Sequence, residues 1–239
     1  MRENILTDWI IVRWSIVSAM GISLAAALVA AFFSGNPALF IGLMGFQIPY
    51  LYLATAFNAE ADQGWLNLRL AANPDRASLV AARYVMMLAV MAASAVLSLV
   101  LYMVLMAGIT ALAPAVGVLA DWLDNAEISR GAAVLCAVVA SFMSGLSGAI
   151  SFPLTFKSGL TKATSFAPMA LFLLMCFGLY AAQGLFAGSV VADWVGGLLM
   201  TFGADGVAYL AAALFAGATC VAMGASYLVA RRMFERRDI

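Results

Sequence analysis

The residues that could support catalysis are few, and their placement gives no sign of a reaction centre. The sequence of 239 residues contains three cysteines and no histidine. Cys136, Cys176 and Cys220 each lie in a different apolar stretch, so we expect neither a disulfide nor a Cys/His metal site. A phosphate-binding G-x-x-x-x-G-K-[ST] loop is also absent, which means that the chain cannot hydrolyse ATP by itself. We therefore predict a non-enzyme with no catalytic residue, metal or cofactor of its own.

The largest polar segment of the chain covers residues 58–79. Glu60 and Asp62 precede a short amphipathic stretch, at a position where a helix N-terminus would favour their negative charge. A proline after about three turns would end this helix. Its apolar face carries Trp65, which must be buried by a partner protein or by lipid headgroups. The candidate contact residues are Glu60, Asp62, Gly64, Trp65, Leu68, Arg69, Pro74 and Arg76.

A second and smaller polar cluster contains Lys157 and Lys162. These lysines could contact the same partner as the segment 58–79, or anionic lipid at the membrane surface. Two prolines, Pro49 and Pro153, fall inside apolar stretches, where they would bend or break a helix. Near the second of them, small residues at Ser144, Gly145, Ser147 and Gly148 form a stripe. Such stripes let helices pack closely; the alternative is a substrate path.

The elements that carry these residues are predicted to be membrane-spanning helices. The chain is 65% apolar and only 10% charged, unlike a soluble domain. Its long uncharged stretches each exceed the roughly 20 residues that one bilayer crossing needs. We predict an all-α polytopic membrane protein with a single transmembrane domain over residues 1–239. The six spans are expected at about 15–33, 37–57, 80–112, 131–156, 164–187 and 206–230.

The basic residues predict the orientation of these spans. With the N-terminus inside, eleven of the twelve Lys and Arg residues lie on the cytoplasmic side, and only Arg130 lies outside. This bias follows the positive-inside rule and places both termini in the cytoplasm. Residues 3–14 are expected to form an interfacial helix before the first span, because Ile5 and Trp9 share a face and charged residues flank it. The alternative is that they begin span one.

The segment 188–205, before the last span, allows two interpretations. It is largely apolar, contains Gly196 and Gly197, and is too short to cross the membrane and return as full helices. It could be a re-entrant hairpin that dips in from outside. It could equally be an amphipathic helix on the outer surface.

Two cytoplasmic segments resemble those of a known family. The run from Phe57 through Gly64-Trp65 to Asn73-Pro74-Asp75-Arg76, followed by Ala82-Arg83-Tyr84, is similar to the first cytoplasmic loop of small ATP-binding-cassette (ABC) exporter permeases of the second type. The run Pro153-Leu154-Thr155-Phe156-Lys157-Ser158-Gly159-Leu160-Thr161-Lys162 is similar to an element between spans four and five of that family. Asn73 departs from the leucine that is common before the loop proline.

The resemblance implies a role in transport. It implies that segment 58–79 is a coupling loop gripped by a separate ABC ATPase, which binds ATP and Mg. It also implies a second permease copy or paralogue, a multi-pass location in the bacterial cytoplasmic membrane, and outward transport by alternating access. Similar short permeases include exporters of amphipathic peptides, such as the phenol-soluble-modulin exporter. A hydrophobic or amphipathic cargo, such as a peptide or antimicrobial, is therefore expected.

Two other functions remain open on the residues alone. The lack of reactive groups also fits a non-catalytic membrane anchor or assembly subunit for another enzyme. A secondary carrier or channel is disfavoured, because such proteins usually keep an ionisable group at mid-membrane and the predicted spans offer none. The partners that the resemblance implies are an ATPase and a second permease, and the spans imply the lipid bilayer. No role for nucleic acid is expected.

Overall fold

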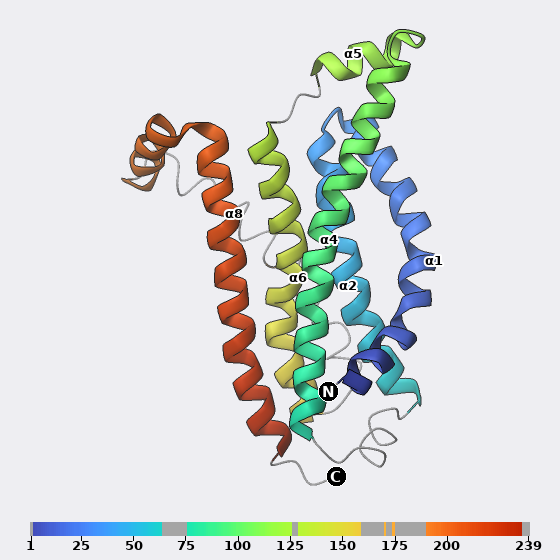
Figure 1. Cartoon of the computed structure of the whole chain (residues 1–239), viewed down its shortest axis with the longest axis vertical. Helices are drawn as coiled ribbons and strands as arrows, with labels where there is room; N and C mark the ends of the chain where they lie inside the picture. Colours follow the sequence, from blue (N-terminus) through green and yellow to red (C-terminus); the bar gives the residue numbers. More distant parts are fainter. Residues whose placement is uncertain are drawn as a thin grey trace.

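A computed structural model of the chain shows a bundle of long α-helices (Figure 1). The structure describes residues 2–63, 76–125, 129–158, 170, 174 and 190–235. The helices are α1 (Arg2–Ser34), α2 (Pro37–Gln63), α4 (Arg76–Leu112), α5 (Gly117–Asn125), α6 (Arg130–Ser158) and α8 (Val190–Glu235). Five of them contain stretches long and apolar enough to span a membrane: Val12–Ser34, Pro37–Ala56, Ala77–Leu112, Arg130–Phe156 and Gly197–Phe234. The prediction of an all-α polytopic membrane protein is thus confirmed.

The predicted spans 15–33, 37–57, 80–112, 131–156 and 206–230 correspond to α1, α2, α4, α6 and α8. The remaining predicted span, 164–187, lies outside the described residues. Helices α6 and α8 run in the same direction in Figure 1. Helix α1 begins and α8 ends at the same end of the bundle, here named the terminal end; the opposite end carries α5 and is named the α5 end (Figure 1).

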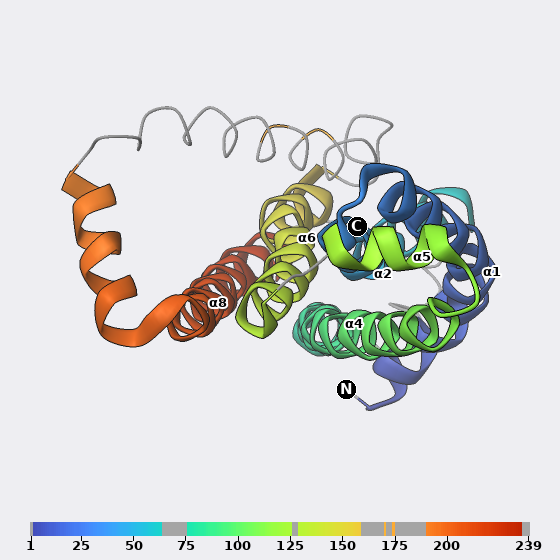
Figure 2. The ribbon, with the colours of Figure 1, turned by 90° about the horizontal axis from the view of Figure 1, so that it is seen from above.

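The predicted interfacial helix 3–14 is not a separate element, because α1 is one helix from Arg2 to Ser34. Its first turns nevertheless tilt away from the axis of the rest of α1 (Figures 1 and 2). The stretch of α1 that is apolar enough to span a membrane begins only at Val12. An interfacial position for the turns before it stays a prediction.

Helix α2 is longer than predicted, and this corrects the placement of two acidic residues. The helix continues to Gln63, so Glu60 and Asp62 lie in its last turns rather than at the N-terminus of a new helix. Both positions thus belong to the C-terminal turns of a helix, where the dipole disfavours acidic residue types. The extension has a simple cause, since Ala59, Ala61 and Gln63 are helix formers and neither glycine nor proline lies between Ala59 and Gly64.

The turn between α1 and α2 shows why two spans form here instead of one long helix. Gly35 ends α1 with a φ of 65°, in the left-handed region that favours glycine. The Asn36 side chain then accepts a hydrogen bond from the Ala38 backbone N–H at 2.9 Å. Pro37 fills the first helical position, where no N–H is needed. The residue that ends α1 is thus followed directly by the residues that begin α2.

Small residues of α6 let three other helices approach it closely. The α6 side chains Ser141, Ser144, Ser147 and Ser151 are all buried. A Cβ added to Gly145 would overlap the Met91 sulfur of α4 and lie 3.0 Å from the Thr219 methyl carbon of α8. Helix α6 contacts α2, α4 and α8. The small-residue stripe is therefore a packing surface within the chain, and the packing interpretation is confirmed.

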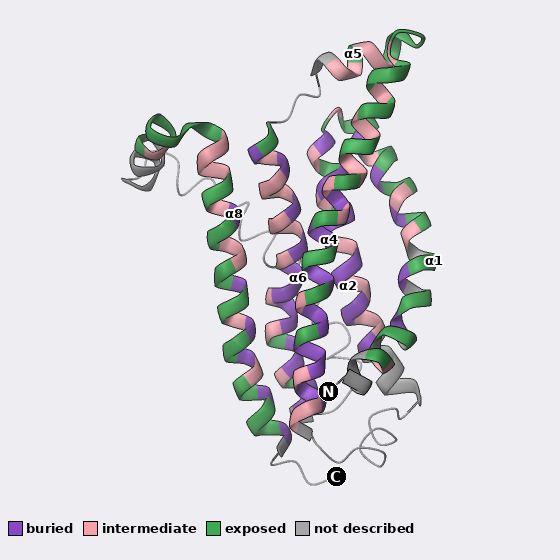
Figure 3. Ribbon diagram, viewed as in Figure 1, coloured by how far each residue is buried: buried purple, intermediate pink, exposed green. Residues whose placement is uncertain are grey.

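The core is not evenly spread along the bundle. Its largest buried cluster joins α1, α2, α4, α6 and α8 toward the terminal end, around Tyr52, Met87, Phe152 and Phe234. Two smaller clusters lie toward the α5 end, around Phe40 and Ile41. In Figure 3 the buried residues follow the faces where α2, α4 and α6 meet, whereas α8 is largely exposed. The helices are thus most tightly joined at the terminal end.

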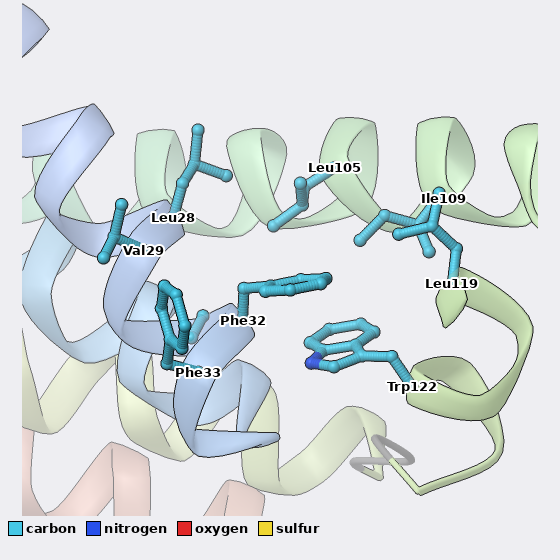
Figure 4. A pocket seen from close by; sticks show the side chains of 9 residues that line it. Leu28, Val29, Phe32, Phe33, Leu105, Ile109, Leu119 and Trp122 are labelled. Carbon is cyan, nitrogen blue, oxygen red and sulfur yellow. The ribbon is translucent and has the colours of Figure 1, made fainter. Parts of the chain in front are cut away.

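Helix α5 was not predicted from the sequence. It lies across the α5 end, where Trp122 stacks on Phe32 of α1 with ring centroids 6.4 Å apart (Figures 1 and 4). Leu105 and Ile109 of α4 line the same apolar pocket of about 330 Å³. Sequence reasoning missed α5 because nine residues between two spans give too short a pattern to separate from a loop.

The segment before the last span is a helical arm. Helix α8 is continuous from Val190 to a bend at Gly203, where φ is 71°, and Gly196 and Gly197 do not interrupt it. The described residues therefore form no hairpin turn at these glycines, and a re-entrant or surface-lying position of the arm stays a prediction. Figures 1 and 2 show the arm projecting sideways from the bundle, and its Met200 side chain is 94% exposed. An apolar helix in this position agrees with the surface-lying alternative.

The tight contact at Gly145 predicts a loss of stability when a larger residue replaces this glycine. Replacing Gly145 by valine should lower the free energy of unfolding by about 1–3 kcal/mol, because Met91 and Thr219 leave no room for the branched side chain. Thermal unfolding of the purified protein in detergent measures this effect. Gly217→Val on α8 is the matched control, since a Cβ there meets nothing within 4 Å. Equal destabilisation by both variants would contradict the packing argument.

Candidate coupling site and the helices above it

The structure places the flanks of the predicted coupling loop at the terminal end of the bundle. Helix α2 ends there at Gln63, and α4 begins there at Arg76 (Figure 1). Of the predicted contact residues, Glu60 and Asp62 lie in the last turns of α2, and Arg76 opens α4. The others lie outside the described residues: Gly64, Trp65, Leu68, Arg69 and Pro74. The predicted coupling loop of 58–79 is thereby shortened to the connection between two helices.

The second predicted contact lies at the same end. Lys157 belongs to the last turn of α6, which ends at Ser158, whereas Lys162 lies outside the described residues. Three helix ends therefore lie together at the terminal end: the end of α2, the start of α4 and the end of α6 (Figure 1). One partner surface beneath the bundle could reach all three.

The two prolines do not break their helices. Pro49 lies inside α2 and Pro153 lies inside α6, and both helices continue past them. A proline removes one backbone donor, and neighbouring side chains can compensate within a bundle. The structure therefore contradicts a break at either proline, and the alternative of a bend stays a prediction.

Hydrogen bonds between helices are found just inside the terminal end. The Tyr84 hydroxyl of α4 lies 2.6 Å from the Ser226 hydroxyl of α8. Ser226 donates its own proton to the Ala149 carbonyl of α6, so Tyr84 must be the donor of the first bond. Tyr84 also packs against Phe152 of α6, with ring centroids 4.9 Å apart. One tyrosine therefore joins three helices.

A buried arginine lies beside this network. Arg83 is only 2% exposed although it carries a charge, which is unusual for arginine. The Tyr52 hydroxyl of α2 donates to the Arg83 backbone carbonyl at 3.5 Å. The sequence analysis treated Arg83 as one of several cytoplasmic charges and missed its burial. The available signal was its place seven residues inside the helix that starts at Arg76, between alanines and a tyrosine.

A different polar junction is found at the α5 end. Ser129 precedes α6, and its hydroxyl accepts a hydrogen bond from the Ala132 N–H at 3.2 Å. The Asp205 carboxylate of α8 accepts the Gly131 N–H at 2.9 Å and a further bond from Ser129. A Cβ on Gly131 would lie 2.6 Å from the Asp205 Cα, so only glycine allows this approach. The N-terminus of α6 is thus capped both by Ser129, which precedes it, and by Asp205 of α8.

Removal of the tyrosine hydroxyl should weaken the terminal end. Tyr84→Phe is expected to lower the free energy of unfolding by about 1 kcal/mol, since it removes one buried hydrogen bond and keeps the ring packing. Thermal unfolding in detergent measures this loss. Combined with Ser226→Ala in a double-mutant cycle, it should show a coupling energy above about 0.5 kcal/mol.

The control for this experiment is Tyr227→Phe. The Tyr227 ring packs against Tyr84 at 5.6 Å, but its hydroxyl makes no hydrogen bond with the described residues. This variant should leave the stability unchanged within about 0.5 kcal/mol. If the effects of Tyr84→Phe and Ser226→Ala simply add, the network does not act as a unit.

Comparison with known families identifies the bundle. No curated protein and no solved structure matches the chain. A family model described as ABC-2 family transporter protein matches residues 5–235, which is nearly the whole chain. The match includes all the spanning helices and both polar clusters of the terminal end. The chain therefore belongs to the ABC-2 transporter family, as a multi-pass membrane permease that works with an ABC ATPase.

Proposed function

We propose that the chain is the permease subunit of an ATP-driven exporter, which moves a hydrophobic or amphipathic substrate outward by alternating access. A separate ABC ATPase would bind ATP and Mg, and it would also bind the segment between α2 and α4. One observation carries this proposal: α2, α4 and α6 all present their polar ends at the terminal end, directly below the most tightly packed part of the bundle. The family match supports the ATPase partner.

The packing above the segment favours transmission of force. Tyr52 and Leu53 of α2, Leu79 and Val80 of α4, and Phe156 of α6 are buried in one cluster. Close-packed interiors deform little, so a push on the connection between α2 and α4 would move these helices as one body. A loosely packed terminal end would absorb the same push locally.

The surfaces of the spans favour an apolar cargo. The large exposed side chains of α1, α4 and α8 are apolar along most of their length, for example Phe33, Val104 and Val221. A second permease copy or paralogue facing this one would complete a path between the two bundles, without a ring of charge. A peptide or antimicrobial cargo rests on the family resemblance of the two cytoplasmic segments.

Trp65 and the two acidic residues of α2 provide the direct test. We expect Trp65→Ala, and separately the combined Glu60→Lys and Asp62→Lys variant, to reduce co-purification of the partner ABC ATPase by at least about tenfold, the range seen for interface hot spots. Trp14→Ala is the matched control, because Trp14 is 69% exposed on α1 and lies in neither polar cluster. It should leave recruitment unchanged.

The second half of the test is transport in reconstituted vesicles. The intact complex should couple ATP turnover to outward movement of an amphipathic peptide, and the Trp65 variant should lose both. Full recruitment of the ATPase by the variants would contradict the proposed contact between the ATPase and the segment between α2 and α4. A complex without substrate-stimulated ATP turnover would instead indicate an anchor or assembly subunit, and transport driven by an ion gradient without ATP would indicate a secondary carrier.

A further inference from the structure

An apolar wedge opens between α4, α6 and α8 at the α5 end. It encloses about 500 Å³ and is lined by apolar residues such as Leu99, Met103 and Val134, together with the rings of Tyr102 and Tyr209. Arg130 is the one charged residue in its lining. In Figure 1, α8 diverges from α4 toward this end. The wedge is thus a consequence of how the helices separate.

The packing of the bundle sets how deep the wedge can reach. Below it, Met91 of α4 and Thr219 of α8 both meet α6 at Gly145 and close the space between the helices. The lining residues of α4 extend from Leu99 to Met106, which is about 10 Å along a helix. One leaflet of a bilayer contributes roughly 15 Å of hydrocarbon. The wedge therefore has the depth of part of an acyl chain in a single leaflet.

Arg130 adds a charge at the rim of this apolar space. It is the first residue of α6 and is exposed, and among the described residues it makes no hydrogen bond or ion pair. Asp205 attracts it from nearby, but that carboxylate already accepts bonds from Gly131 and Ser129. The guanidinium thus keeps its donors available. An arginine fork is well suited to a phosphate group.

We propose that this wedge binds a phospholipid of the leaflet at the α5 end. One acyl chain lies along Leu99, Met103 and Val134, and the phosphate binds the Arg130 guanidinium. The rings of Tyr102 and Tyr209 line the wedge beside this chain. The second large pocket at this end, between α1, α4 and α5, has an apolar lining without a charged side chain, so it offers no equivalent anchor.

The experiment measures binding of phosphatidylglycerol to the full-length chain in detergent, by native mass spectrometry with a lipid titration. Arg130→Gln should weaken binding about tenfold, the effect of losing a charge-assisted hydrogen bond. Arg130→Lys should stay within about threefold of the unchanged protein, because it keeps the charge. Arg232→Gln is the matched control, since it removes one exposed positive charge from the terminal end of α8.

A second pair of variants tests the apolar part and does not depend on Arg130. Met103→Trp fills the wedge and should reduce lipid binding at least about tenfold, whereas Val104→Trp changes the neighbouring exposed residue outside the wedge and should not. Circular dichroism of each variant confirms that it is folded. Loss of binding in Val104→Trp as well would overturn the assignment of the wedge.

Two ligands separate a lipid site from simpler explanations. Diacylglycerol with the same chains but no phosphate should bind at least about tenfold more weakly than phosphatidylglycerol. Inorganic phosphate at millimolar concentration should not displace the lipid, because it lacks the acyl chain. Equal binding of diacylglycerol, displacement by phosphate, or unchanged binding by Arg130→Gln would each overturn the proposal. None of these outcomes depends on recruitment of an ATPase.

Discussion

Close approach of helices to α6 is the constraint on which the rest of the bundle depends. Lipid tails are as apolar as the side chains of the spans, so the hydrophobic effect does little to hold the helices together within the bilayer. Dispersion contacts and hydrogen bonds must do so, and both require short distances. Gly145 lets α4 and α8 come within contact of α6. The Ser144 hydroxyl reaches the Phe46 carbonyl of α2 at 3.3 Å, and Ser94 reaches the Gly45 carbonyl at 2.8 Å.

The helices pack more closely at one end of the bundle than at the other, and this difference suits a permease. At the terminal end, large aromatic residues such as Tyr52, Phe152 and Phe234 fill the space between five helices. At the α5 end the clusters are small, and pockets open between the helices. For the alternating access proposed above, the terminal end would be the stiff end that receives force, and the α5 end the looser end that changes shape, because packed cores switch between discrete states and deform little.

The sequence predicted the spans well, because charged residues mark the ends of uncharged stretches longer than a bilayer crossing. It also predicted the separation of the first two spans, at 15–33 and 37–57, and the packing role of the α6 stripe. It failed where the deciding signal was local or tertiary. The extension of α2 through Glu60 and Asp62 followed from helix propensity, which the charge pattern concealed. The burial of Arg83 depends on neighbours from other helices, which no single stretch of sequence reveals. Residues 64–75, the centre of the candidate site, lie outside the described residues.

The polar contacts also indicate which helices can separate. Asp205 holds the start of the upright part of α8 against the N-terminus of α6, and the backbone approach at Gly131 leaves no space between them. Ser226 bonds the same two helices near the terminal end. Helices α6 and α8 are therefore joined at both ends. Helix α4 is bonded to α8 through Tyr84, at the terminal end. A movement of α4 at the α5 end, with Tyr84 as the fixed point, would therefore leave all three of these contacts between helices in place.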